Sequence, residues 1–392
     1  MIPQWSISTL LLYLIMGLVP LIAIKNEDAQ RARSGRHAAP VAFGYAAWAT
    51  VWVIFATWRG IGQGFGGSDA PTYVSYFQVC LDPYSDHLYV QHSDLGFALI
   101  NQALRLVASD YHVLFVILYG LIVYSYIYVV RTFRINSASI APLIAVVFIF
   151  IRGFTSLRMN VAVAFILISI CFLFRGRTKF AILFAVCSVF IHKASILYAC
   201  FILVYFYDRK NGLSLVKCFI GMAIATAAAG AVQNLFLNGG MSFFDNGAYA
   251  SYATKSIGGS FFDGFWKIAF GQILLLFTLT LFNKPIVAYL RSLTKEDASK
   301  ARFVKSVVLF DLASIPVTYV LGVWRGYEYL YIFRLLMWGI AISAVSAGLN
   351  KRSKWAVNVM TVLIFAIWIG NRWFATYQDS ALMPYVFQLF AG

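Results

Sequence analysis

Apolar runs long enough to cross a lipid bilayer recur from one end of this 392-residue chain to the other. The hydrocarbon core of a bilayer needs a helix of about 20 mostly apolar residues. Hydrophobic residues make up 61% of the chain and charged residues 12%, whereas about 25% charged is usual in soluble domains. One soluble core could not bury this much apolar surface. The sequence therefore predicts an all-α, polytopic membrane protein and excludes cytosolic enzymes, disulfide-stapled secreted domains and disordered chains.

The hydropathy pattern divides the chain into twelve predicted membrane segments within a single membrane domain, 1–392, since no internal repeat or linker is visible. The segments are 5–24, 40–58, 111–130, 137–151, 156–174, 180–191, 194–207, 218–236, 264–282, 306–323, 327–349 and 355–370. A shorter apolar helix at 95–108 is expected to dip into the membrane or lie on its surface. His192 and Lys193 interrupt the run 180–207, which is either two short spans or one tilted helix; the alternation of basic loops favours two.

Positive charge is concentrated in alternate connections between these segments. The connections are 25–39, 131–136, 175–179, 208–217, 283–305 and 350–354. They contain 21 of the 31 Lys and Arg but 5 of the 15 Asp and Glu, so they carry the whole net charge of +16. The positive-inside rule makes them cytoplasmic, with loops 59–110 and 237–263 and both termini external. Such loops fix orientation and attract anionic lipid; they do not indicate a nucleic-acid site.

Metal and redox chemistry find little support in the sequence. The five cysteines form no CxxC pair, and four of them fall in or beside predicted spans. The segment 86–94 contains Asp86, His87, His92 and Asp94, but their spacing matches no known metal motif. We therefore expect a polar surface loop here, and neither a metal nor a cofactor in the protein.

Charged residues outside the basic loops are the informative ones, because ionisable groups in membrane segments are costly and default to functional hypotheses. Most of them fall at the predicted outer ends of spans, although they come from five separate regions. They are Arg59, Asp69, Asp94, Arg152, Arg158, His192, Lys193, Arg325, Glu328 and Arg334. A shared, outward-facing polar site is the most economical explanation.

The segment 59–73, RGIGQGFGGSDAPTY, predicts an anion-binding loop. Its five glycines let the backbone approach a ligand closely, and Asp69 and Tyr73 follow one helical turn apart. The alternative is a flexible outer loop in which Arg59 reaches the interface. A dinucleotide-binding loop is excluded because a membrane helix, not a strand, precedes the glycines.

Two arginines flank a short outer turn in 151–169, and a histidine lies in a second turn. Arg152 and Arg158 offer planar forks that match phosphate oxygens, although interfacial arginines also occur without function. His192 is either a polar helix end or a base that titrates near neutral pH. Asp94 begins a helix, where the helix dipole alone favours a carboxylate.

The segment 325–338, RGYEYLYIFRLLMW, contains the strongest single candidate. Arg325 and Glu328 are three residues apart and can pair, while Tyr327, Tyr331 and Arg334 share one helical stripe. At 1.5 Å per residue, Arg334 is expected about 10 Å below the outer end of its helix. An arginine at that depth needs a partner or a cavity.

Short motifs in this order resemble the EpsG/Wzy-type polysaccharide polymerase family over about 59–335. They are Arg59-Gly60 with Asp69 and Tyr73, Asp94-Leu-Gly-Phe, Leu157-Arg-Met-Asn-Val-Ala, Ile191-His-Lys-Ala-Ser and Tyr331-Ile-Phe-Arg-Leu. Asp94 stands where the family usually has Glu, and Asn160 where it often has Gln. Asp94 is shorter by one methylene, which weakens the case for a direct catalytic role.

The resemblance implies a GT-C-like glycosyltransferase of the bacterial inner membrane that polymerises undecaprenyl-diphosphate-linked oligosaccharide repeats at the outer face. Implied partners are the lipid-linked oligosaccharide, membrane lipid and a chain-length regulator protein. Cations for the lipid diphosphate would come from the predicted outer arginines. The acceptor base would be Asp69, with His192 as its rival and Glu328 less favoured because Arg325 can pair with it. Two other classes stay open: a transporter or flippase of lipid-linked sugars, and a sibling glycan ligase or acyltransferase.

Overall fold

The structure is a computed structural model that describes residues 7–34, 43–62, 66–86, 94–211, 214–237, 261–320, 326–380, 382 and 386. Within these ranges the regular elements are helices joined by turns, and no strand is formed, which confirms the predicted all-α class. The longer helices are α1 (Ile7–Ser34), α2 (Phe43–Thr57), α3 (Ala70–Val79), α5 (Leu95–Val107), α6 (Tyr111–Phe133), α7 (Val146–Arg152), α8 (Leu157–Phe174), α9 (Thr178–Ile191), α11 (Phe201–Asn211), α12 (Leu215–Leu237), α14 (Phe261–Leu281), α15 (Asn283–Ser292), α16 (Lys295–Val320), α17 (Tyr331–Val345) and α18 (Lys351–Ser380).

Several of these helices are suited to cross a membrane. Within the described residues, four are long and apolar enough by themselves, namely Ile7–Gln30, Tyr111–Phe133, Leu157–Phe174 and Lys351–Gly370. A fifth arises if Phe270–Leu281 and Asn283–Ser292, which meet at 76°, form one broken span. Each of the other predicted segments also lies on helical structure, but on shorter or more polar helices. The chain is therefore a membrane protein with a helical bundle.

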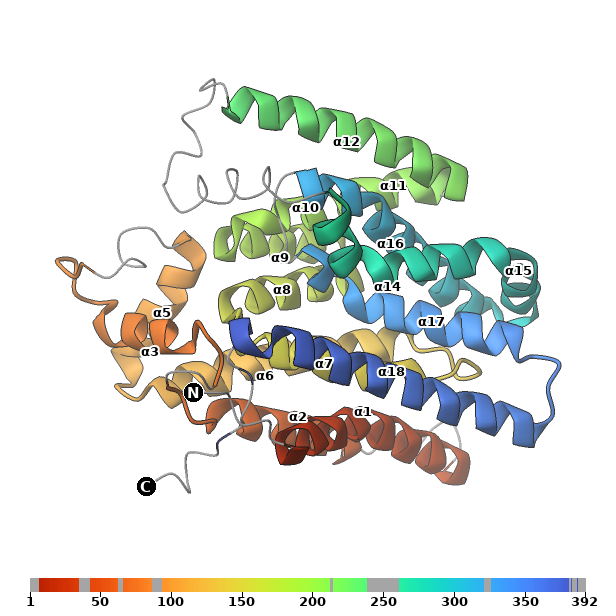
Figure 1. Ribbon diagram of the computed structural model, residues 1–392, viewed down its shortest axis with the longest axis horizontal. Helices are drawn as coiled ribbons and strands as arrows, with labels where there is room; N and C mark the ends of the chain where they lie inside the picture. The colour runs from red at the N-terminus through yellow and green to blue at the C-terminus, as the bar shows by residue number, and fades with distance from the viewer. Residues whose placement is uncertain are drawn as a thin grey trace.

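The centre of the bundle is α8, which packs against α6 and α9. Within its membrane-length window 78% of the residues are buried, compared with 11% for α18. In Figure 1, α12 lies along one long edge of the bundle, and α1 and α2 lie along the opposite edge. The turn that leads into α8 is thus surrounded by protein, which makes the start of α8 a sheltered position for a site.

The two ends of the bundle carry different elements (Figure 1). The short helices α3 and α5 gather at one end, whereas α15 lies at the other. These elements belong to the predicted external loop 59–110 and the predicted cytoplasmic loop 283–305. Loops that the charge pattern assigns to opposite sides of the membrane therefore lie at opposite ends of the bundle.

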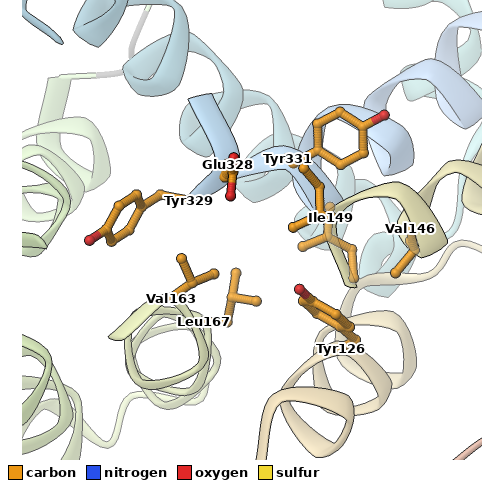
Figure 2. A pocket seen from close by; sticks show the side chains of 9 residues that line it. Tyr126, Val146, Ile149, Val163, Leu167, Glu328, Tyr329 and Tyr331 are labelled. Atoms are coloured by element: carbon orange, nitrogen blue, oxygen red, sulfur yellow. The ribbon is translucent and has the colours of Figure 1, made fainter. Parts of the chain in front are cut away.

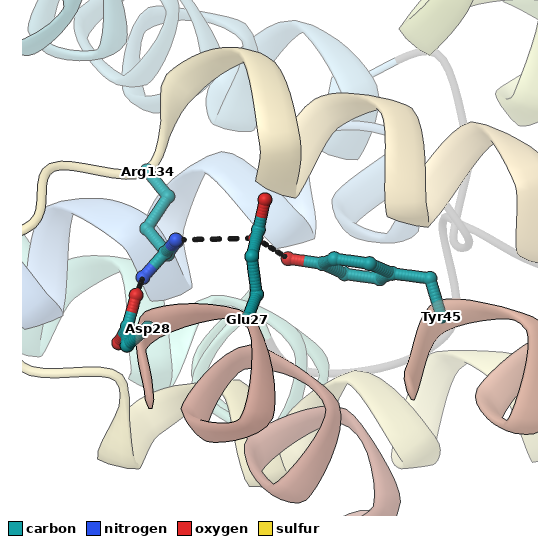
Figure 3. A network of polar contacts seen from close by, with 4 residues as sticks. All are labelled: Glu27, Asp28, Tyr45 and Arg134. Atoms are coloured by element: carbon teal, nitrogen blue, oxygen red, sulfur yellow. Dashed lines mark hydrogen bonds and ion pairs between the residues drawn. The ribbon is translucent and has the colours of Figure 1, made fainter. Parts of the chain in front are cut away.

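A network of polar contacts joins α1, α2 and Arg134, the residue that follows α6 (Figure 3). Arg134 Nη1 lies 2.6 Å from Asp28 Oδ1, and Arg134 Nη2 lies 3.3 Å from Glu27 Oε2. Tyr45 donates a hydrogen bond of 2.7 Å to the same Glu27 oxygen. Helix α1 continues into the predicted loop 25–39. Its last turns contain good helix formers, and the Glu27 carboxylate is paired there with Arg134 and Tyr45.

The apolar run 180–207 is broken at the predicted place. Helix α9 ends at Ile191, and His192 adopts an extended conformation before the 3-10 helix η2 (Lys193–Ser195). The chain then continues through α10 (Ile196–Ala199) into α11. The run is therefore not one continuous helix, and the break leaves His192 at a helix end. Both parts are shorter than the helices that could each cross a membrane, so the expectation of two spans stays a prediction.

Candidate functional site

Three predicted site residues from distant parts of the chain meet around one carboxylate. Asp94 Oδ2 lies 3.3 Å from Arg158 Nη1 and 3.6 Å from His192 Nδ1. Asp94 precedes α5, Arg158 lies in the first turn of α8 and His192 follows α9. The Asp94 side chain is 4% exposed, whereas Arg158 and His192 are 20% and 16% exposed. We refer to Asp94, Arg158 and His192 as the outer cluster.

A glycine allows α5 to bring Asp94 to this place. A Cβ atom on Gly96 would stand 2.9 Å from the carbonyl carbon of Phe190 and 3.1 Å from the backbone nitrogen of Ile191. The start of α5 therefore rests directly on the last turn of α9, next to His192. Because α8 and α9 pack along their lengths, the same arrangement brings Arg158 into the cluster.

Gly67, in the described part of the glycine-rich segment 59–73, lies on the turn between α7 and α8. Gly67 has φ of +101°, and a Cβ atom there would collide with the backbone of Phe154 and Thr155. Asp69 follows as the residue before α3, partly exposed, and its Oδ1 accepts a 3.1 Å hydrogen bond from Ser68. Close backbone approach, the use predicted for these glycines, is thus made to the protein's own turn.

Arg59 is fully buried at the end of α2. Its guanidinium carbon lies 4.5–5.1 Å from the ring centroids of Phe115, Tyr119 and Phe154. It donates hydrogen bonds to the carbonyls of Ala56 and Gly66, the second at 2.7 Å. These contacts fix the end of α2 and the glycine loop. Tyr73 is also buried and packs edge-on against Phe97.

A second ion pair lies behind the α7–α8 turn, between Arg152 and Glu328. Arg152 Nε is 3.7 Å from Glu328 Oε1, and the Glu328 side chain is 0% exposed. Figure 2 shows Glu328, on the 3-10 helix η4 (Gly326–Glu328), beside a small cavity that Tyr126, Val163 and Leu167 also line. Arg325, the partner that the sequence suggested for Glu328, lies outside the described residues.

A third ion pair lies inside the bundle and involves Arg334, for which the sequence predicted a partner or a cavity. Arg334 Nε is 2.8 Å from Asp311 Oδ2, on α16, and Gln272 Nε2 of α14 donates to the same oxygen at 3.3 Å. The Arg334 guanidinium also lies over the Tyr331 ring, 5.2 Å from its centroid. Helix α17 begins at Tyr331, so Arg334 lies in its first turn and not about 10 Å below the helix end as predicted. Its side chain is nevertheless buried, and its partner is Asp311. Sequence reasoning missed Asp311, although a single carboxylate in the apolar run 306–323 is a signal for it.

Tyr198 contacts residues on both sides of Glu328. Its hydroxyl donates a 2.6 Å hydrogen bond to the Gly326 carbonyl, and its ring stacks on Tyr329 at 4.1 Å.

Among the residues that the structure describes, no group of three His, Cys, Asp or Glu side chains is placed to hold a metal ion. His87 and His92 of the segment 86–94 lie outside those residues.

Comparison with known proteins places the chain in a family. The model of the EpsG family matches residues 47–387, which is most of the chain and includes every candidate residue discussed above. The chain belongs to the EpsG family. Membership indicates a polysaccharide-polymerase-type membrane protein, of glycosyltransferase-like character, and confirms the resemblance seen in the short motifs. No curated protein and no solved structure matches the chain.

Proposed function

We propose that this EpsG-family protein is a glycosyltransferase that polymerises undecaprenyl-diphosphate-linked oligosaccharide repeats at the outer face of the bacterial inner membrane. The proposal includes twelve spans in a GT-C-like arrangement, external termini and a chain-length regulator protein as a further partner. The observation that carries it is the outer cluster: an arginine, a histidine and a carboxylate converge from three separate segments at the end of the bundle predicted to be external.

The proposed reaction transfers the growing glycan from one lipid carrier to the next repeat. A hydroxyl of the acceptor sugar attacks the anomeric carbon of the donor, and a base takes the hydroxyl proton. The bond between that carbon and the diphosphate oxygen breaks, and undecaprenyl diphosphate leaves with the bonding electrons. Negative charge thus develops on the diphosphate, where Arg158 can provide a fixed cation and a bidentate hydrogen-bond donor.

The base is the point at which the structure adds most to the sequence. Asp69 was preferred from sequence, and it comes two residues after Gly67, whose backbone contacts the α7–α8 turn that leads to Arg158. The structure adds support for His192, because the Asp94 carboxylate faces its Nδ1. A carboxylate on one ring nitrogen orients the imidazole and stabilises the protonated ring. We therefore propose His192 as the base, with Nε2 as the reacting nitrogen and Asp69 as the alternative.

The test is a polymerisation assay with purified protein and purified lipid-linked repeats. His192→Gln should lower turnover by at least about 100-fold, within the range for general-base catalysis. The variant Asp69→Asn decides between the two bases. The matched control is Asp86→Asn, which makes the same substitution at an exposed position of the same predicted external loop. Absence of polymer with the wild-type protein would rule out the proposed function. Normal turnover by His192→Gln together with an inactive Asp69→Asn would transfer the role to Asp69.

A further inference from the structure

The Asp94 carboxylate faces the Arg158 guanidinium and the His192 imidazole through a single oxygen. Arg158 and His192 both approach Oδ2, at 3.3 and 3.6 Å, and neither contact has hydrogen-bond geometry. The oxygen is buried and accepts no hydrogen bond from the described residues. A buried carboxylate oxygen without a hydrogen bond is costly, so Asp94 Oδ2 gains from moving closer to either partner.

We propose that Asp94 is shared between Arg158 and His192 in the unliganded protein and is released to His192 when a diphosphate binds Arg158. This inference rests on the proposed function, because it assigns the anion on Arg158 to the leaving group. Asp94 is then a positioning residue: when a diphosphate occupies Arg158, Asp94 raises the proton affinity of His192. The base would then reach full strength only when a donor is in place.

The electrostatic argument follows from the distances. While Arg158 is paired with Asp94, its guanidinium neutralises part of the carboxylate charge and disfavours a proton on His192. A diphosphate draws Arg158 to itself, and Asp94 can then close the 3.6 Å gap to Nδ1. An opposite charge at hydrogen-bond distance favours the protonated imidazole by about 1–3 pH units.

Other charges near His192 do not offer the same exchange. The elements in contact with the end of α9 are α5, α8, α10 and η2. Near His192 they provide Asp94, Arg158 and the exposed Lys193, which is the next residue along the chain. Arg105 of α5 and Lys179 of α9 lie at the far ends of their helices. Within these elements, Asp94 is therefore the one carboxylate positioned to respond when Arg158 changes partner.

The experiment measures how readily His192 is protonated, with and without inorganic pyrophosphate. Diethyl pyrocarbonate modifies only unprotonated imidazole, and peptide mass spectrometry separates His192 from the other four histidines. In the wild-type protein, pyrophosphate should move the half-point of the pH profile of His192 upward by about one unit. In Asp94→Asn the shift should be less than half as large, because only the direct field of the anion remains. His112, which lies on α6, is the internal control and should not shift.

Arg158→Gln provides a second and independent arm. If Arg158 competes for Asp94, its removal should raise the half-point of His192 even without pyrophosphate, and added pyrophosphate should change it little. Size-exclusion profiles report whether each variant is folded. An equal shift in the wild-type protein and Asp94→Asn would overturn the proposal, as would an unmoved wild-type profile or no pyrophosphate binding at millimolar concentration. A protein that shows the coupling but makes no polymer would instead contradict the proposed function.

Discussion

Arg334 and Asp311 form an ion pair of 2.8 Å between α17 and α16, with side chains that are 6% and 1% exposed. Gln272 adds a third helix, α14, to the same carboxylate. Removing one member of a buried pair leaves an uncompensated charge and costs about 3–5 kcal/mol, whereas replacing both by apolar residues is often neutral. Arg334 therefore has a structural role in this pair. The sequence predicted a different role, contact with the lipid diphosphate.

The first prediction separates these roles by removing the charges singly and together. Arg334→Met and Asp311→Leu should each lower the unfolding temperature in detergent strongly, and the double variant should recover most of the loss. The measurement is thermal unfolding followed by a polymerisation assay on the folded double variant. Full activity of that variant would make Arg334 purely structural. A well-folded but inactive one would support contact with substrate.

The second prediction keeps the charge of Arg334 and changes its shape. Arg334→Lys can still pair with Asp311, but an ammonium cannot reproduce the planar fork that binds two oxygens. If Arg334 contacts the leaving group, turnover should fall by about 100- to 1000-fold, with an unfolding temperature close to that of the wild-type protein. Unchanged polymer length and amount would exclude such a contact.

The sequence predicted the positions of the helices well because hydropathy is a local property. The break at His192 and the helix at 95–108 were both expected, and both are present. Pairing between distant residues was harder to foresee. The contacts of Arg152 with Glu328 and of Asp94 with His192 depend on how the helices pack. Residue spacing along the chain does not predict such packing. Sequence alone also could not show that three aromatic rings surround Arg59.

The third prediction concerns Gly96, which sets the distance between α5 and α9. In Gly96→Ala the new methyl would meet the backbone of Phe190 and Ile191, which cannot move aside as a side chain can. The start of α5 should shift, and Asp94 with it. A misplacement of about 1 Å near an active site can cost about 100-fold in rate. The control is Gly120→Ala in α6, where a Cβ meets nothing within 4 Å. Normal activity of both variants would show that the position of α5 does not matter for the site.

The fourth prediction tests which end of the bundle is external. In a cysteine-free background, single cysteines replace Tyr84, which is 92% exposed, and Glu296, whose side chain is 77% exposed. The charge pattern places Tyr84 outside and Glu296 in the cytoplasm. A membrane-impermeant maleimide added to intact cells or spheroplasts should label position 84 and not 296, while permeabilised cells should show both. Labelling at 296 in intact cells would reverse the orientation and remove the outer cluster from the external side.

The last prediction uses the acid that caps α6. Asp110 Oδ1 accepts a hydrogen bond of 2.9 Å from the backbone N–H of His112, and this bond, together with the adjacent imidazole, holds the pKa of Asp110 below its usual value. Because the folded protein lowers this pKa, the stabilisation is complete above the unfolded value of about 3.9 and is lost as pH falls through the lower, folded value.

Asp110→Ala should therefore cost about 1 kcal/mol at neutral pH, a modest amount because the carboxylate is 62% exposed. The difference in unfolding temperature between the wild-type protein and the variant should shrink as pH falls below about 4. Asp110→Asn keeps an acceptor oxygen for the His112 N–H and is the matched control; it should retain most of the stability at neutral pH and show a weaker dependence on acid. A wild-type advantage over Asp110→Ala that persists unchanged at low pH would show that the ionised carboxylate does not stabilise this helix end.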